Sequence, residues 1–132
     1  MRPSTKILFA LSLALPWAPA LAEAAQGYRP LAGYECMSLN ISDAQAHDFH
    51  FHVIYYSEPN AASPEVGYAG SQVAVRKPHV VVNGFAQALF PTGVVGWIEA
   101  DLLRSYRSPF NPSTKCIPVM FSDGRRDFQY FP

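Results

Sequence analysis

The chain has 132 residues, and its ten basic and ten acidic side chains cancel to a formal net charge of zero. A chain of this length can build one hydrophobic core, so we expect a single domain. The charges are scattered and show no basic excess, which argues against a nucleic-acid partner or an anionic membrane surface.

The first residues have the layout of a secretory signal peptide. Arg2 and Lys6 form a basic start, and an apolar run of nine residues follows at positions 7–15. Ala-Leu-Ala at positions 20–22 then supplies the small residues of a cleavage site before Glu23. The apolar run is too short to cross a bilayer, which takes about 20 helical residues.

We therefore expect export to remove residues 1–22. The remaining segment, residues 23–132, carries eight basic and ten acidic side chains, a net charge of −2. No cysteine stands at the cleavage point, where a lipid anchor would be attached. The predicted product is a periplasmic or secreted monomer without a membrane anchor.

The mature segment contains two cysteines, Cys36 and Cys116. An even number of cysteines in an exported protein favours a disulfide. This bridge would close a loop of about 80 residues and stabilise the fold by about 4 kcal/mol in the chain-entropy model. A reactive thiol has less support, because the chain has no CxxC motif and neither cysteine has a histidine close in sequence.

The N-terminal part of the mature segment has the weakest pattern. Within it, Ser42 is a typical N-cap for a short helix in the sequence ISDAQA. An alternating run follows, and we expect a β-strand with one face made by Phe49, Phe51, Val53 and Tyr55 and the other by His50, His52, Ile54 and Tyr56.

The same run holds His47, His50 and His52, three of the four histidines of the chain. His50 and His52 would share one face of a strand, and neutral imidazole suits Zn²⁺, Cu²⁺ or Ni²⁺. His47 could add a third ligand if the chain bends there. Against this, two histidines on one strand face do not complete a ligand set. A periplasmic metal-binding protein is therefore an alternative; otherwise we expect no cofactor.

Further along, short strands alternate with turns. Residues 57–67 are predicted to form a loop rich in Pro, Ser and Asn, and residues 71–77 a strand. Asn83-Gly84 suits the two positive-φ positions of a type I′ hairpin turn. Residues 94–98 are the next predicted strand, and residues 99–103 a single helical or 3₁₀ turn.

The C-terminal part is predicted to end in a β-hairpin. A last strand of the central segment is expected to pass through Tyr106, and residues 108–115 form a coil. Asp123-Gly124 then separates two apolar runs, residues 116–121 and residues 125–131, as in a hairpin. The predicted disulfide would attach this hairpin to the N-terminal segment.

Six short motifs stand in a fixed order between positions 53 and 103. They are VIYYSEPN from Val53 to Asn60, Gly67, Val73-Ala74-Val75, Asn83-Gly84-Phe85, Gly93-Val94-Val95-Gly96-Trp97-Ile98 and Ala100-Asp101-Leu102-Leu103. In this order and spacing the motifs resemble the bacterial SH3-like (SH3b) domain family. The resemblance implies a mainly β fold with a small, partly open barrel as its core, residues 53–103. Residues 23–52 and 104–132 would be extensions of that core.

The resemblance also implies which face of the first strand is buried. In the register of the family Val53 and Tyr55 point into the core, and Phe49 and Phe51 do so too if the strand continues to them. His50 and His52 would then lie on the solvent face or under the N-terminal extension, which argues further against a metal site.

The resemblance also implies a binding function. SH3-like domains bind extended ligands in aromatic-lined grooves, and the expected ligand is peptidoglycan or a protein segment in the periplasm or cell envelope. The groove would lie between the Pro59 loop and the sheet that carries Phe85 and Trp97. Its candidate ligand-binding residues are Tyr56, Tyr68, Phe90 and Trp97.

Catalysis is not expected. The sequence contains no GxSxG, HExxH, Walker or Rossmann motif. A third interpretation is a structural or inhibitory protein whose terminal hairpin docks onto another chain.

Overall fold

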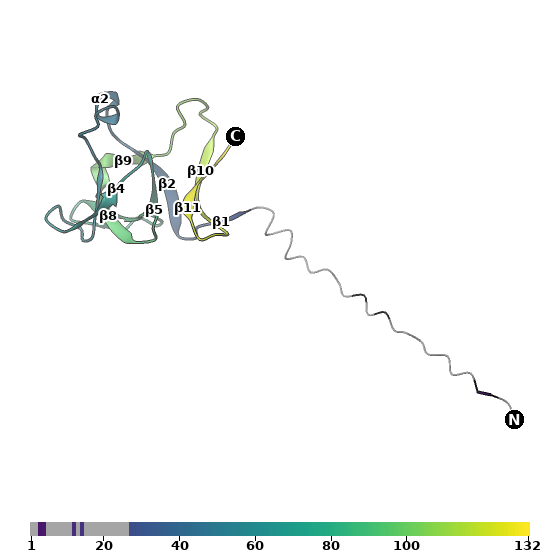
Figure 1. Cartoon of the computed structure of the whole chain (residues 1–132). Coiled ribbons are helices and arrows are strands. Elements are labelled where there is room, and N and C mark those ends of the chain that lie inside the picture. The colour runs from purple at the N-terminus through teal and green to yellow at the C-terminus, as the bar shows by residue number, and fades with distance from the viewer. Residues whose placement is uncertain (1–2, 5–11, 13, 15–26) are drawn as a thin grey trace.

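The structure is a computed structural model that describes residues 3, 4, 12, 14 and 27–132. The predicted cleavage site and nearly all of the predicted signal peptide lie outside the described residues. Figure 1 shows the folded part as a larger group of strands beside a smaller group that contains β1, β10 and β11. Among the described residues, no helix has the length and apolar character needed to cross a membrane.

Of the eleven strands in the described residues, eight form the larger sheet. Their order is β4-β3-β8-β7-β5-β2-β9, with β6 paired beside β7. They are β2 (Tyr34–Leu39), β3 (Ile54–Tyr56), β4 (Glu65–Tyr68), β5 (Gln72–Arg76), β6 (Val81–Val82), β7 (Phe85–Leu89), β8 (Val95–Glu99) and β9 (Leu103–Ser105). The end strands β4 and β9 are not paired with each other, so the sheet is not closed into a barrel.

The smaller sheet has three antiparallel strands in the order β1-β10-β11. Its strands are β1 (Tyr28–Pro30), β10 (Lys115–Phe121) and β11 (Arg126–Phe131). The described helices are both short, α2 (Asp43–Ala46) and the 3₁₀ turn η1 (Ala100–Leu102). The predicted mainly β fold is therefore confirmed.

One face of the larger sheet encloses the main hydrophobic core. Successive side chains of a strand point to opposite faces, so each strand contributes every second residue. Met37 and Leu39 of β2 pack against the edge of this core. The buried cluster consists of Val53, Tyr55, Val73, Val75, Ala86, Ala88 and Ile98.

The other face of β2 and β5 is covered by the smaller sheet. Cys36, Ser38 and Ala74 are buried there, and Val119 of β10 has no exposed surface. The Cys36–Cys116 disulfide joins β2 to β10 with an S–S distance of 2.05 Å, which confirms the predicted pairing. The bridge thus fastens the two sheets together across their interface.

Three local predictions are confirmed by the backbone. The Ser42 hydroxyl accepts the Gln45 N–H at 3.1 Å, and the Gln45 side chain accepts the Ser42 N–H in return, so α2 begins with a capping box. Asn83 and Gly84 have φ values of 52° and 79° and connect β6 to β7. Gly124 has a φ of 88° in the turn between β10 and β11.

Other boundaries differ from the prediction. The sequence predicts a loop for residues 57–67, but strand β4 begins within this segment at Glu65. The strand expected to pass through Tyr106 ends one residue earlier, as β9. The sequence did not predict β2, yet it lies between β5 and β9 in the larger sheet. The N-terminal flank therefore supplies a strand of the main sheet.

The prediction that Phe49 points into the core is wrong. Its side chain is 93% exposed, whereas Val53 and Tyr55 are buried as expected and Phe51 packs against the core edge. The physical reason is a turn: the Asp48 carboxylate accepts the His50 N–H at 2.9 Å. Strand β3 begins only at Ile54, so the alternation does not extend back to position 49.

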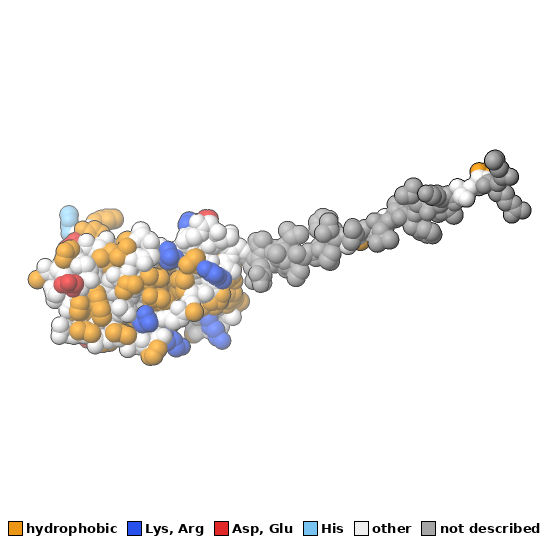
Figure 2. All heavy atoms as spheres, turned by 90° about the horizontal axis from the view of Figure 1, so that it is seen from below, with side chains coloured by type: hydrophobic (Ala, Val, Ile, Leu, Met, Phe, Trp, Pro, Cys, Tyr) orange, Lys and Arg blue, Asp and Glu red, His pale blue; other side chains and the backbone are white. Residues whose placement is uncertain are grey.

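Charged side chains are dispersed over the surface. On the face shown in Figure 2, basic side chains lie singly among apolar ones and do not form a continuous patch. Exposed valines are found at positions 80–82, around strand β6, and at positions 94 and 95.

Candidate binding cleft

A cleft of about 400 Å³ lies between the two sheets, and we call it the intersheet cleft. One wall is β11 of the smaller sheet, and the other is built from β5 and the ends of β4 and β7. The wall residues that carry its chemistry are Tyr68, Gln72, Leu89, Arg126, Phe128 and Tyr130. The volume lies within the range of small-ligand sites, about 300–1,000 Å³.

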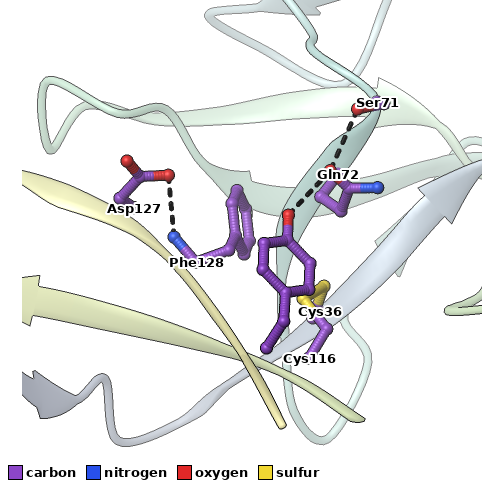
Figure 3. The surroundings of a disulfide bond; sticks show 7 residues. Cys36, Ser71, Gln72, Cys116, Asp127 and Phe128 are labelled. Atoms are coloured by element: carbon purple, nitrogen blue, oxygen red, sulfur yellow. Dashed lines mark hydrogen bonds between the residues drawn. A yellow bond between two sulfur atoms is a disulfide. The ribbon is translucent and has the colours of Figure 1, made fainter. Parts of the chain in front are cut away.

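Hydrogen bonds fix the polar part of the cleft. The Tyr130 hydroxyl donates to the Gln72 side-chain oxygen at 3.0 Å, and the Ser71 hydroxyl donates to the same oxygen at 2.9 Å (Figure 3). Burial, followed by the nearby Tyr106 and Asp127, raises the pKa of the Tyr130 hydroxyl above its usual value. Tyr130 therefore stays protonated and keeps donating at neutral pH.

Figure 3 also shows the Phe128 ring projecting from β11 toward the strand that carries Gln72. The ring is half-buried. Because the disulfide holds β10, and β10 pairs with β11, the position of Phe128 over the larger sheet is covalently supported. The cleft is therefore largely preformed, which lowers the entropy lost when a ligand binds.

Arg126 supplies a positive charge to the cleft. A Cβ added to Gly93, which has a φ of 92°, would lie 2.7 Å from the Arg126 guanidinium, so this side chain lies against the Gly93 backbone. Arg126 is half-buried and has no carboxylate within ion-pair distance among the described residues.

The neighbouring arginine behaves differently. Arg125 is exposed and donates from Nε to the Asp123 carboxylate at 2.6 Å. Hydrogen bonds from the Arg125 backbone and side chain lower the pKa of Asp123 below its usual value. The charge of Arg125 is thus already paired within the hairpin turn.

The four aromatic residues predicted to line a groove do not meet in one place. Tyr68 lines the intersheet cleft, is 55% exposed and stacks on His52 with ring centroids 4.1 Å apart. Phe90 instead packs edge-on against the core residue Tyr55, with centroids 5.1 Å apart.

Tyr56 and Trp97 lie opposite each other in the β3–β8 ladder. Tyr56 packs edge-on against Phe85 and borders a separate hollow of about 250 Å³ beside α2. We call this the helix-side hollow; it is lined by Gln45, Phe51, His52, Ile54, Tyr56, Glu99 and Leu102.

The three clustered histidines are engaged in separate local contacts. The Nδ1 atom of His47 lies 2.7 Å from the Asp43 carbonyl oxygen, and His52 is stacked on Tyr68. The backbone N–H of His50 belongs to the turn at Asp48. Among the described residues, no group of three or more His, Cys, Asp or Glu side chains is placed to hold a metal ion.

The sequence did not indicate a site at the cleft residues Gln72, Arg126, Phe128 and Tyr130. The available sequence signals were indirect: a disulfide between Cys36 and the strand before the Asp123-Gly124 turn brings the whole terminal hairpin next to β2. The alternation Arg126-x-Phe128-x-Tyr130 then places three long side chains on one face.

The geometry of the intersheet cleft suits a ligand of modest size. It offers apolar walls, fixed hydrogen-bonding groups and a positive charge, features common to binding sites. Comparisons with protein-family models, curated proteins and solved structures found no match for this chain.

Proposed function

We propose that this chain is an exported, non-catalytic binding module with an SH3-like core, acting in the periplasm or cell envelope. Its ligand is peptidoglycan or a protein segment. The observation that carries the proposal is the preformed intersheet cleft, which combines the exposed ring of Tyr68 with the hydrogen-bonded pair of Gln72 and Tyr130. Such aromatic-lined grooves suit extended ligands.

The intersheet cleft does not include the Pro59 loop, where the SH3b resemblance implies the ligand-binding groove. Of the four aromatic candidates from that resemblance, Tyr68 is retained as a cleft residue. Tyr56 belongs to the helix-side hollow and serves as a contrasting position. The segment that carries the SH3-like motifs, residues 53–103, supports the general mode of binding, because it contains six of the eight strands of the larger sheet, β3 to β8.

Export is supported by two features. The signal-peptide layout precedes Glu23, and the Cys36–Cys116 disulfide suits an oxidising compartment. In this proposal the disulfide holds the smaller sheet in the position where it forms one wall of the cleft.

Retention of the mature protein, residues 23–132, on purified peptidoglycan tests the proposal, together with selection from a library of linear random peptides. We expect retention on one of these two probes, and Tyr68→Ala should weaken it by about tenfold, the effect of losing one well-packed aromatic contact. Tyr56→Ala is the matched control and should leave binding nearly unchanged. Absence of binding to both probes, or equal loss in both variants, contradicts the proposal.

A further inference from the structure

Strand β11 is an edge strand. Within the described part of the chain it pairs with β10 and with no other strand. The N–H of Phe121 donates to the Arg125 carbonyl at 2.8 Å. This bond shows which residues of the hairpin direct their backbone groups toward the partner strand. Backbone groups of successive residues point alternately to the two sides of a strand. Asp127 and Gln129 therefore bond toward β10, as Arg125 does.

By the same alternation, the β11 edge is made by Arg126, Phe128 and Tyr130. Their backbone N–H and C=O groups point away from β10, and all three residues line the intersheet cleft. Exposed backbone groups of this kind are a template for an added strand. At the rise of an extended chain the three residues span about 13 Å, so a peptide of about five residues would cover them.

One of these edge groups is capped from within the chain. The Asp127 carboxylate turns back and accepts the Phe128 N–H at 2.8 Å, as Figure 3 shows. The alternation along β11 would direct the Asp127 side chain away from the cleft. The hydrogen bond to the Phe128 N–H instead holds its carboxylate at the strand edge, which explains why Asp127 lines the cleft. The Asp127 carboxylate occupies the position that a carbonyl group of an added strand would take. Rotation of the Asp127 side chain would free the Phe128 N–H for that carbonyl group.

The charge beside the edge indicates the chemistry of the partner. Arg126 is half-buried and unpaired among the described residues, so a carboxylate brought to it would gain a charge-assisted hydrogen bond. We propose that a protein segment bearing an acidic side chain binds as an additional β-strand on the β11 edge, with that side chain at Arg126. This inference rests on the proposed binding function and narrows its ligand.

A peptide fits the β11 edge better than a glycan. The edge offers donors and acceptors at the two-residue spacing of a strand, and a peptide backbone repeats the complementary groups at that spacing. A glycan strand has no such row of amides. Peptidoglycan bound in the cleft without engaging these backbone groups is therefore the outcome that overturns the inference.

The test uses a peptide selected by the mature protein from a library of linear random peptides. Amide hydrogen exchange is measured by NMR on isotope-labelled protein with and without that peptide. We expect slower exchange at Phe128 and Tyr130 on binding. The Tyr130 N–H becomes bonded to the peptide, and the Phe128 N–H exchanges the exposed Asp127 carboxylate for a backbone carbonyl of the peptide. Exchange at Asp127 and Gln129 should change little, since those groups already bond to β10.

Two matched substitutions test the side-chain part. Arg126→Ala should weaken binding by about tenfold or more, the usual effect of losing a charge-assisted hydrogen bond. Arg125→Ala removes a positive charge from the adjacent residue. It should change the affinity by less than about twofold, because Arg125 is already paired with Asp123.

A third substitution is expected to strengthen peptide binding instead of weakening it. Asp127→Ala frees the Phe128 N–H and removes a carboxylate that competes for the edge, so binding should tighten by about two- to tenfold. The inference is overturned if no peptide is selected, if the Phe128 and Tyr130 amides are unaffected, or if Asp127→Ala weakens binding. If those amides are unaffected while Tyr68→Ala still weakens binding, the edge inference fails and the proposed function stands.

Discussion

Tyr55 belongs both to the core of the larger sheet and to the wall of the intersheet cleft. Its side chain is only 2% exposed, and burial raises the pKa of its hydroxyl far above the usual value. The folded state therefore favours the neutral phenol, and deprotonation is easier in the unfolded chain. This makes Tyr55 a source of alkaline sensitivity.

We predict that Tyr55→Phe reduces the loss of stability at high pH. A raised folded-state pKa contributes stability that is complete below the unfolded value of about 10 and is lost as pH rises beyond it. Urea unfolding of wild type and variant, at neutral pH and above about pH 10, measures the difference. Tyr28→Phe is a suitable control, because no comparable burial affects that residue. An equal alkaline loss in wild type and Tyr55→Phe contradicts the assignment.

Gly67 illustrates a close approach within the larger sheet. A Cβ added there would lie 2.5 Å from the Phe90 ring, which is held by its edge-on contact with Tyr55. We predict that Gly67→Ala lowers the free energy of unfolding by about 1–3 kcal/mol, the usual cost of overpacking.

Chemical denaturation of Gly67→Ala measures this cost, and Gly70→Ala is its matched control. A Cβ at Gly70 meets no atom within 4 Å. Equal midpoints for the two variants would show that Phe90 moves aside without penalty.

At the level of elements, sequence predicts those that carry their own local chemistry. The Asn83-Gly84 and Asp123-Gly124 turns and the Ser42 cap depend on residues a few positions apart, so their structures follow from the sequence. Strand β2 escapes prediction for a different reason. Its two faces are both covered, one by the core through Met37 and the other by the smaller sheet through Cys36, so it shows no polar face.

The intersheet cleft could not be predicted because it depends on long-range docking. Gln72 meets Tyr130 across 58 positions of sequence. No local pattern in either strand indicates that contact. The cysteine pair was the available long-range restraint, and it predicts proximity of the two segments without predicting which side chains meet.

The disulfide gives a prediction for the smaller sheet. Cys36 and Cys116 are 80 positions apart, so the Cys36→Ala/Cys116→Ala variant should lose about 2–5 kcal/mol of unfolding free energy. Urea denaturation at neutral pH measures the loss. Wild type in reducing agent should approach the stability of the double variant. An unchanged midpoint in both experiments would contradict the predicted contribution.

For the whole molecule, the export proposal predicts a defined N-terminus. Expression of the full chain in a bacterial host should yield a periplasmic product that begins at Glu23, as measured by N-terminal sequencing and intact mass. Ala22→Phe removes a small residue from the cleavage site and should leave the segment attached. A cytoplasmic product that retains Met1 in both cases would contradict the proposal.

The disulfide and the sheet order also set the order in which the two sheets can be completed. Every strand of the larger sheet is complete by Ser105, so a chain that emerges N-terminus first can assemble that sheet before the last strands arrive. Strand β1 and Cys36, in contrast, are made early and must wait for partners close to the C-terminus. The cleft is therefore finished last, and a prematurely terminated chain would keep one wall of it without the other.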